Sequence, residues 1–210
     1  MPEIKHEIAG LLLQSKAILL EPATPFTWAS GWRSPIYCDN RITLSYPEIR
    51  ERIKSAFVEV IRTHFQAPDV IAGVATGAIA QGALVADTMK LPFIYVRASA
   101  KEHGRKNMIE GRISPGSRVV VIEDLVSTGG SSLKAVEAIR EAGAEVTGMT
   151  AIFSYGFQVA TENFAKAGVA LATLTDYHTL IETAVQSGDI TREQVGLLKQ
   201  WRENPSAWEP

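Results

Sequence analysis

The segment VVVIEDLVSTGGSS, residues 119–132, is the part of the sequence that says most about the fold. Its apolar start is typical of a buried strand, which we expect over 118–124, and the strand runs into two adjacent acids, Glu123 and Asp124. Two more apolar residues and a group of glycines and hydroxyl side chains then lead into a helical pattern over 131–143. A strand, a small-residue loop and a helix in this order predict an α/β protein with a ligand site where the strand meets the helix.

The remainder of the chain repeats this alternation from Tyr46 onward. We expect strands over 69–75, 92–97, 118–124, 145–155 and 168–175, and helices over 47–65, from the loop after 75 to about 90, and over 131–143, 157–167, 180–185 and 191–201. Because these strands are near-continuous apolar runs, the pattern predicts a mostly parallel sheet flanked by helices on both faces. Ligands bind such sheets at the carboxyl ends of the strands, which draws attention to the loops 75–78, 98–112 and 123–132.

The N-terminal part differs from the rest of the chain in its composition and pattern. Residues 3–20 are expected to form an amphipathic helix, and the aromatic, Pro- and Gly-containing stretch 25–41 to form short strands and turns as a small hood. We therefore expect one compact domain with an N-terminal segment over 1–45, a core over 46–180 and C-terminal helices over 181–210 that pack on the core.

Composition restricts the classes of function. Of 210 residues, 46% are hydrophobic and 21% charged, and the formal net charge of -2 implies no general attraction to nucleic acid or to an anionic membrane. The single cysteine, Cys38, excludes an internal disulfide and any metal site built from several thiolates. The apolar run at the N-terminus of the chain is too short and too interrupted for a signal peptide or a membrane helix, so we expect a cytoplasmic protein.

The loop after the central strand is suited to an anion. Backbone N–H groups at a helix start point outward without partners, and the helix dipole favours negative charge there. The small side chains of the loop add hydroxyl donors or allow close approach of a ligand: Ser127, Thr128, Gly129, Gly130, Ser131 and Ser132. No Gly-Lys-Ser/Thr or G-x-G-x-x-G pattern is present, which excludes a Walker loop and a dinucleotide fingerprint. Taken alone, the loop is also compatible with an ordinary capped helix.

The two acids make the ligand interpretation stronger. Glu123 and Asp124 cannot bind a phosphate, but they suit sugar hydroxyls or a hydrated cation such as Mg²⁺. A ligand that carries a ribose diol next to a phosphate would satisfy both the acids and the loop.

At this point the residues carry a resemblance. The run of apolar residues, two acids, two apolar residues and Ser-Thr-Gly-Gly-Ser resembles the signature with which phosphoribosyltransferases bind 5-phosphoribosyl-1-pyrophosphate (PRPP). Purine, uracil and orotate enzymes share this signature, so it leaves the acceptor open. The order Arg97, Lys101, His103-Gly104 resembles the catalytic loop of orotate phosphoribosyltransferases, and FTWASGWRSPIYCDNR (26–41) is similar to their hood segment. Read alone, the basic loop is also compatible with a solvated charged loop.

The resemblance to the orotate phosphoribosyltransferase family implies a type I phosphoribosyltransferase fold and a Mg²⁺-dependent pentosyltransferase. Such an enzyme joins orotate to ribose 5-phosphate from PRPP in the synthesis of UMP. It also implies a homodimer in which the catalytic loop reaches the neighbouring active site. The implied catalytic residues are Arg97, Lys101, His103 and Asp124, and Tyr37 and Ser127 are implied to contact orotate. PRPP is implied to contact Ala75, Thr76, Gly77, Arg97, Lys101, His103, Glu123, Asp124, Ser127, Thr128, Gly129, Gly130 and Ser131. Mg²⁺ is expected to be held mainly by PRPP, without assigned protein ligands.

This sequence also departs from the family pattern. Ala29, Gly77 and Ala98 stand where some relatives carry basic residues, and no arginine follows the strand that ends at Tyr155, where some relatives hold the orotate carboxylate. We therefore expect the backbone N–H groups of residues 75–78 to carry more of the pyrophosphate binding.

Two alternative functions stay open at this stage. A transferase for a purine or another base would share the PRPP signature, although the hood segment argues against it. A regulatory protein that keeps the fold to bind a nucleotide or RNA is disfavoured by the presence of Lys101 and His103 and by the net charge of -2.

Overall fold

The computed structural model describes residues 2–28, 31–99 and 108–208. Its contacts divide the chain into two compact units. The terminal unit consists of Met1–Tyr46 and Thr175–Pro210, and the central unit of Pro47–Leu174. The C-terminal helices thus group with the N-terminal segment. Within the described ranges, no helix has the length and apolarity needed to cross a membrane.

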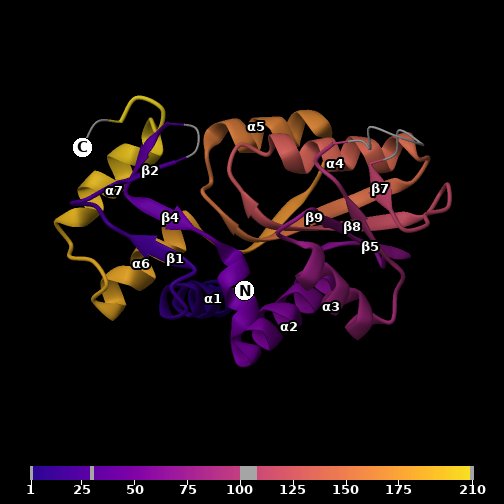
Figure 1. Ribbon diagram of the computed structural model, residues 1–210, viewed down its shortest axis with the longest axis horizontal. Helices are drawn as coiled ribbons and strands as arrows, with labels where there is room; N and C mark the ends of the chain where they lie inside the picture. The colour runs from indigo at the N-terminus through magenta and orange to yellow at the C-terminus, as the bar shows by residue number, and fades with distance from the viewer. Residues whose placement is uncertain (1, 29–30, 100–107, 209–210) are drawn as a thin grey trace. The chain divides into compact units, whose positions relative to one another are not determined.

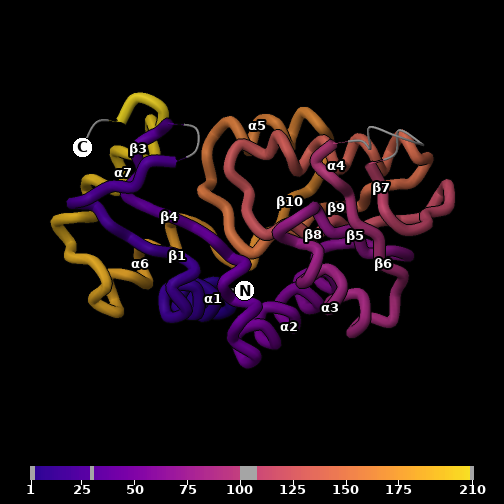
Figure 2. The backbone as a smooth tube through the Cα atoms, in the orientation of Figure 1, coloured from indigo at the N-terminus to yellow at the C-terminus, as the bar shows by residue number. Residues whose placement is uncertain are grey.

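The central unit is built on a six-stranded sheet (Figure 2). The strand order is β10-β9-β8-β5-β6-β7. The strands are β5 (Val70–Val74), β6 (Phe93–Val96), β7 (Ile109–Glu110), β8 (Arg118–Val126), β9 (Glu145–Ser154) and β10 (Leu171–Asp176). β5 pairs in parallel with β6 and β8, and β8 pairs in parallel with β9, whereas the short β7 runs antiparallel to β6. The predicted mostly parallel sheet is therefore confirmed.

Helices cover both faces of this sheet, as the burial of its strands requires. In Figure 1, α2 (Pro47–His64) and α3 (Ile79–Met89) lie on one face, and α4 (Gly130–Glu141) and α5 (Gln158–Ala167) on the other. The apolar run that opens β8 is completely buried: Val119, Val120, Val121 and Ile122. Because β5 and β8 are parallel neighbours, their carboxyl ends lie at the same edge of the sheet, and the loops that follow them lie close together.

The terminal unit combines helices and two short antiparallel pairs of strands. Its elements are α1 (Pro2–Gln14), β1 (Ile18–Leu20), β2 (Phe26–Thr27), β3 (Arg33–Ser34), β4 (Ile36–Cys38), η1 (Asn40–Ser45), α6 (Tyr177–Ser187) and α7 (Gln194–Glu203). β1 pairs with β4, and β2 with β3. Trp201 of α7 is completely buried, its indole N–H donates to the Arg33 carbonyl at 3.1 Å, and its ring meets the Trp28 ring at 5.6 Å. The C-terminal helix is thereby anchored to the hood strands.

The sequence interpretation was wrong about two boundaries. The helix predicted over 3–20 ends at Gln14, because Lys16 adopts a left-handed conformation and Ile18–Leu20 pairs with β4. The strand predicted over 118–124 continues to Val126, because Leu125 and Val126 keep their pairing with Phe153 and Ser154 of β9. Glu123 and Asp124 therefore lie inside the strand and not at its end.

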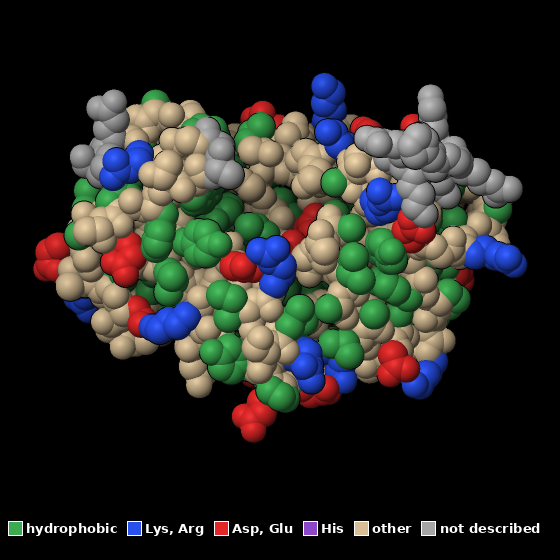
Figure 3. Space-filling model, in the orientation of Figure 1, with side chains coloured by type: hydrophobic (Ala, Val, Ile, Leu, Met, Phe, Trp, Pro, Cys, Tyr) green, Lys and Arg blue, Asp and Glu red, His purple; other side chains and the backbone are tan. Residues whose placement is uncertain are grey.

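Charge is mixed on the surface that is visible in Figure 3, where acidic and basic side chains of the described residues are interspersed. This distribution agrees with the formal net charge of -2.

Candidate functional site

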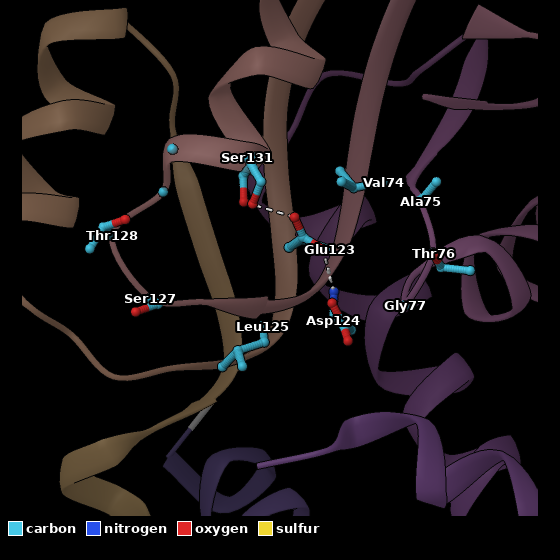
Figure 4. A pocket seen from close by; sticks show the side chains of 13 residues that line it. Val74, Ala75, Thr76, Gly77, Glu123, Asp124, Leu125, Ser127, Thr128 and Ser131 are labelled. Atoms are coloured by element: carbon cyan, nitrogen blue, oxygen red, sulfur yellow. Dashed lines mark hydrogen bonds between the residues drawn. The ribbon is translucent and has the colours of Figure 1, made fainter. Parts of the chain in front are cut away.

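A cavity of about 330 Å³ opens where the loops after β5 and β8 meet (Figure 4). All of its lining residues belong to the central unit. They are Val74, Ala75, Thr76, Gly77, Glu123, Asp124, Leu125, Ser127, Thr128, Gly129, Gly130, Ser131 and Ser132. The structure therefore brings together the two acids, the loop expected to bind phosphate and the loop expected to bind pyrophosphate.

The two acids occupy different environments because successive side chains of a strand point to opposite sides. Glu123 is buried, with 4% of its surface exposed, whereas Asp124 is half-buried. Both carboxylate oxygens of Glu123 accept hydrogen bonds, one from the Ser132 hydroxyl at 2.8 Å and one from the Asp124 backbone N–H at 3.0 Å (Figure 4). Asp124 is thus the acid that is better placed to meet a ligand.

The environment of Glu123 also changes its charge. Burial and the neighbouring Asp124 carboxylate raise the pKa of Glu123 from its ordinary value of 4.5 to about 8, although the Ser132 hydrogen bond acts in the opposite direction. The protonated form of Glu123 is therefore favoured above the pH at which an exposed glutamate loses its proton.

The loop after β5 packs directly against Asp124. A Cβ atom at Gly77 would lie 2.1 Å from Asp124 Oδ2 and 2.3 Å from Asp124 Cγ. Only a glycine therefore fits beneath the carboxylate as it is placed. The loop also contains a cis peptide between Ala75 and Thr76.

The same loop offers fewer backbone donors than expected. The Ala75 N–H donates to the Val96 carbonyl at 2.8 Å, and the Ala78 N–H to the Val74 carbonyl at 3.0 Å. Within the described part of the chain, Thr76 and Gly77 make no backbone hydrogen bond through their N–H groups. The N–H groups of Ala75 and Ala78 are thus already bonded within the protein. Of the four residues expected to present N–H groups to pyrophosphate, Thr76 and Gly77 keep that role as a prediction.

The start of α4 forms the other wall of the cavity. Gly129 precedes the helix with φ of 83°, and an added Cβ would lie 2.8 Å from the Phe164 ring, so both the conformation and the space call for glycine. Thr128, Gly130 and Ser131 are exposed. The N–H groups of a first helical turn have no partner within the helix, so this is the cradle where the sequence predicts that an anion binds.

Some features of this cradle were missed from the sequence. The Asn163 side chain of α5 donates to the Thr128 carbonyl at 3.0 Å and holds the loop from outside. Ser132, expected as a donor to phosphate, is 1% exposed and donates to Glu123. The helical period would have placed Ser132 inward, beside the buried Ala135 and Val136, had it been applied to the first turn.

The other predicted residues are not brought into the described lining of the cavity. Arg97 lies beyond the end of β6, and its guanidinium is 3.5 Å from the Glu110 carboxylate on β7. Tyr37 belongs to β4 of the terminal unit, with 41% of its surface exposed and its ring 5.7 Å from the Phe26 ring. Lys101 and His103 lie outside the described residues.

The described side chains do not form a metal cage. Across residues 2–28, 31–99 and 108–208, no cluster of three or more His, Cys, Asp or Glu side chains is suited to a metal ion. Mg²⁺ typically keeps several waters and combines one or two carboxylates with substrate phosphates. Such an ion needs no cage of protein side chains, so the described residues are compatible with Mg²⁺ that a phosphorylated ligand brings.

Comparison with known proteins identifies the class first. The phosphoribosyl transferase domain family matches residues 44–166, which contain both loops of the cavity. The chain is therefore a phosphoribosyltransferase-fold protein.

The similar proteins narrow this class. The chain is 60% identical over 201 residues to orotate phosphoribosyltransferase of Porphyromonas gingivalis, covering 96% of both chains. It is 55% identical over 205 residues to the enzyme of the same name from Bacillus caldolyticus, covering 98% of this chain and 99% of that one. The crystal structure of orotate phosphoribosyltransferase from Aeropyrum pernix superposes with a TM-score of 0.76 at 30% identity, covering 88% of this chain and 99% of that one. The chain belongs to the orotate phosphoribosyltransferase family.

Proposed function

We propose that this protein transfers ribose 5-phosphate from PRPP to orotate, forming orotidine 5-phosphate and pyrophosphate on the route to UMP. Membership of the family supports the reaction. The structural observation that carries it is the cavity in which the Asp124 carboxylate and the open start of α4 face the same space. A ribose 5-phosphate has hydroxyls for the acid and a phosphate for the helix start.

In this proposal the start of α4 binds the 5-phosphate. The N–H groups of the first turn, aided by the hydroxyls of Ser127, Thr128 and Ser131, donate to the phosphate oxygens, and the helix dipole adds attraction. Asp124 accepts hydrogen bonds from the ribose hydroxyls. Its negative charge then stabilises the positive charge that develops on the sugar as the bond from C1 to the pyrophosphate oxygen breaks.

The leaving pyrophosphate needs positive charge and donors. Thr76 and Gly77 supply backbone N–H groups from the loop after β5, and we assign Arg97, Lys101 and His103 to the same task. When bound, Mg²⁺ neutralises charge on the pyrophosphate, with substrate oxygens as its main ligands. We assign the orotate contacts to Tyr37 and Ser127.

A substrate comparison tests the proposal. The purified protein is supplied with PRPP and Mg²⁺, and with orotate, uracil, hypoxanthine or xanthine in turn. We expect nucleotide formation with orotate and at least about 100-fold lower kcat/KM with the other bases, because a site that hydrogen-bonds orotate leaves polar groups unpaired when it holds a base without the carboxylate. Activity with a purine alone would contradict the proposal.

We also propose that the active form is a homodimer in which Lys101 and His103 serve the partner's site. Mixing a Lys101→Ala chain with an Asp124→Asn chain tests this. If the sites are shared, an equimolar mixture recovers about a quarter of the normal activity, because about half of the dimers are mixed and one of the two sites in each mixed dimer has both intact residues. No recovery in a mixture shown to contain mixed dimers would mean that each chain uses its own loop.

A further inference from the structure

The hydrogen bond between Glu123 and Ser132 connects two parts of the site, the strand that carries Asp124 and the start of α4. Glu123 lies on β8, next to Asp124, and Ser132 lies in the first turn of α4. Their side chains are 4% and 1% exposed and are joined by a hydrogen bond of 2.8 Å. The second oxygen of Glu123 is occupied by the Asp124 N–H. Both side chains thus make their hydrogen bonds to protein groups in a buried setting.

The start of α4 depends on this hydrogen bond because it has no side-chain cap. Most helices fix their first turn with a Ser, Thr, Asp or Asn side chain at the residue before it. Here that residue is Gly129, which makes no side-chain cap, and the contact with Phe164 leaves no room for a larger residue. The hydrogen bond from Ser132 to Glu123 anchors the first turn to the sheet instead.

We propose that Ser132 is a positioning residue, which fixes the phosphate-binding start of α4 relative to Asp124 through its buried hydrogen bond to Glu123. In this role Glu123 connects the first turn of α4 to the strand that carries Asp124. The inference rests on the proposed function for the identity of the ligand, but the link itself is a property of the described chain.

The charge of the pair is consistent with this role. Glu123 and Asp124 are the only titratable side chains among the described lining residues of the cavity. Because burial and Asp124 raise the pKa of Glu123, the neutral form of the link is favoured, and in that form the first turn keeps its attraction for phosphate. Ionisation of Glu123 at alkaline pH would add a negative charge beside the cradle and weaken PRPP binding.

The test compares Ser132→Ala with Ser15→Ala. Ser15 is also a buried serine, 2% exposed, and its hydroxyl donates to the Leu11 and Leu12 carbonyls of the terminal unit. Both variants lose a buried hydrogen bond, so both are expected to melt at a lower temperature. Only Ser132→Ala is expected to raise the KM and the Kd for PRPP, by about tenfold, with kcat and the KM for orotate changed less than about threefold.

The pH profile separates positioning from a general loss of stability. The Ser132 hydrogen bond opposes the rise in the pKa of Glu123, so Ser132→Ala should move the alkaline fall of kcat/KM for PRPP to higher pH. Glu123→Gln should abolish that fall, because an amide does not ionise. Ser132→Cys keeps a weak donor of similar size and should give a KM for PRPP between those of the serine and alanine proteins.

Several results would overturn the inference. If Ser132→Ala binds PRPP as tightly as the unaltered protein and keeps the same alkaline limb, the link does not position the cradle. If Ser15→Ala raises the KM and the Kd for PRPP as much as Ser132→Ala does, the effect reflects a general loss of stability and not the link. Calorimetric titration with PRPP alone makes the comparison without an acceptor, so a failure to use orotate would count against the proposed function and leave this test intact.

Discussion

Replacing Gly77 by alanine should displace the carboxylate on which catalysis depends. The added Cβ would lie 2.1 Å from Asp124 Oδ2, and ordinary contact begins at about 3.4 Å, so the oxygen must move by more than about 1 Å. A misplacement of about 1 Å at a reacting centre costs about 100-fold in rate. We therefore expect Gly77→Ala to lower kcat by about 100-fold.

The same change should cost little stability. The obstructing group is the end of a half-buried side chain, which can rotate away without moving the backbone, so we expect the free energy of unfolding to fall by less than about 1 kcal/mol. Steady-state kinetics with PRPP and orotate, together with thermal melting followed by circular dichroism, measure both effects.

Gly196→Ala is a matched control. Gly196 lies in α7, and an added Cβ meets no atom within 4 Å, so this variant should keep its kinetics and melt at a slightly higher temperature. If Gly77→Ala turned over within threefold of the unaltered protein, Asp124 would not need its observed position, and the role assigned to it would be wrong.

Three further predictions concern pH and charge. Because the folded chain raises the pKa of Glu123 to about 8, it binds a proton that the unfolded chain loses above about 4.5. The stability should therefore decline between these values by up to about 1.4 kcal/mol per pH unit. Glu123→Gln should flatten that decline in thermal melts from pH 5 to 9, and an unchanged slope would contradict the assigned proton. Arg118 lowers the pKa of the exposed Asp69 carboxyl to about 2, so the stabilisation from this ion pair is present above about pH 4 and is lost as the pH falls toward 2. Asp69→Asn should narrow the stability difference between pH 6 and pH 3, as urea titrations at the two values would measure. Lys101→Ala should reduce kcat by about 100- to 1000-fold without lowering the melting temperature, and near-normal turnover would remove Lys101 from the mechanism.

Much of the central unit follows from local sequence. The apolar run 119–122 and the glycines and hydroxyls after it specify a buried strand and an open helix start, and both are present. The end of that strand was less predictable, because Leu125 and Val126 continue it only through their pairing with β9. Because the strand was expected to end at Asp124, the burial of Glu123 inside it was not predicted.

Other features depend on tertiary contacts that the periodicity of apolar residues in the sequence does not predict. The stretch 18–20 is as apolar as the helix before it, and it becomes a strand because β4 is available as a partner. The requirement for glycine at position 77 arises from a carboxylate 47 positions later in the sequence. Both facts belong to tertiary structure, where distant segments set the local outcome.

The position of the tryptophans has a practical consequence for folding experiments. All four tryptophans of the chain fall within the terminal unit, and Trp28 and Trp201 are in ring contact there. Indole fluorescence therefore monitors the terminal unit alone, whereas far-ultraviolet circular dichroism averages over the helices of both units. Coincident denaturation curves from the two signals would indicate a single cooperative transition, and separated midpoints would show that one unit melts while the other still stands.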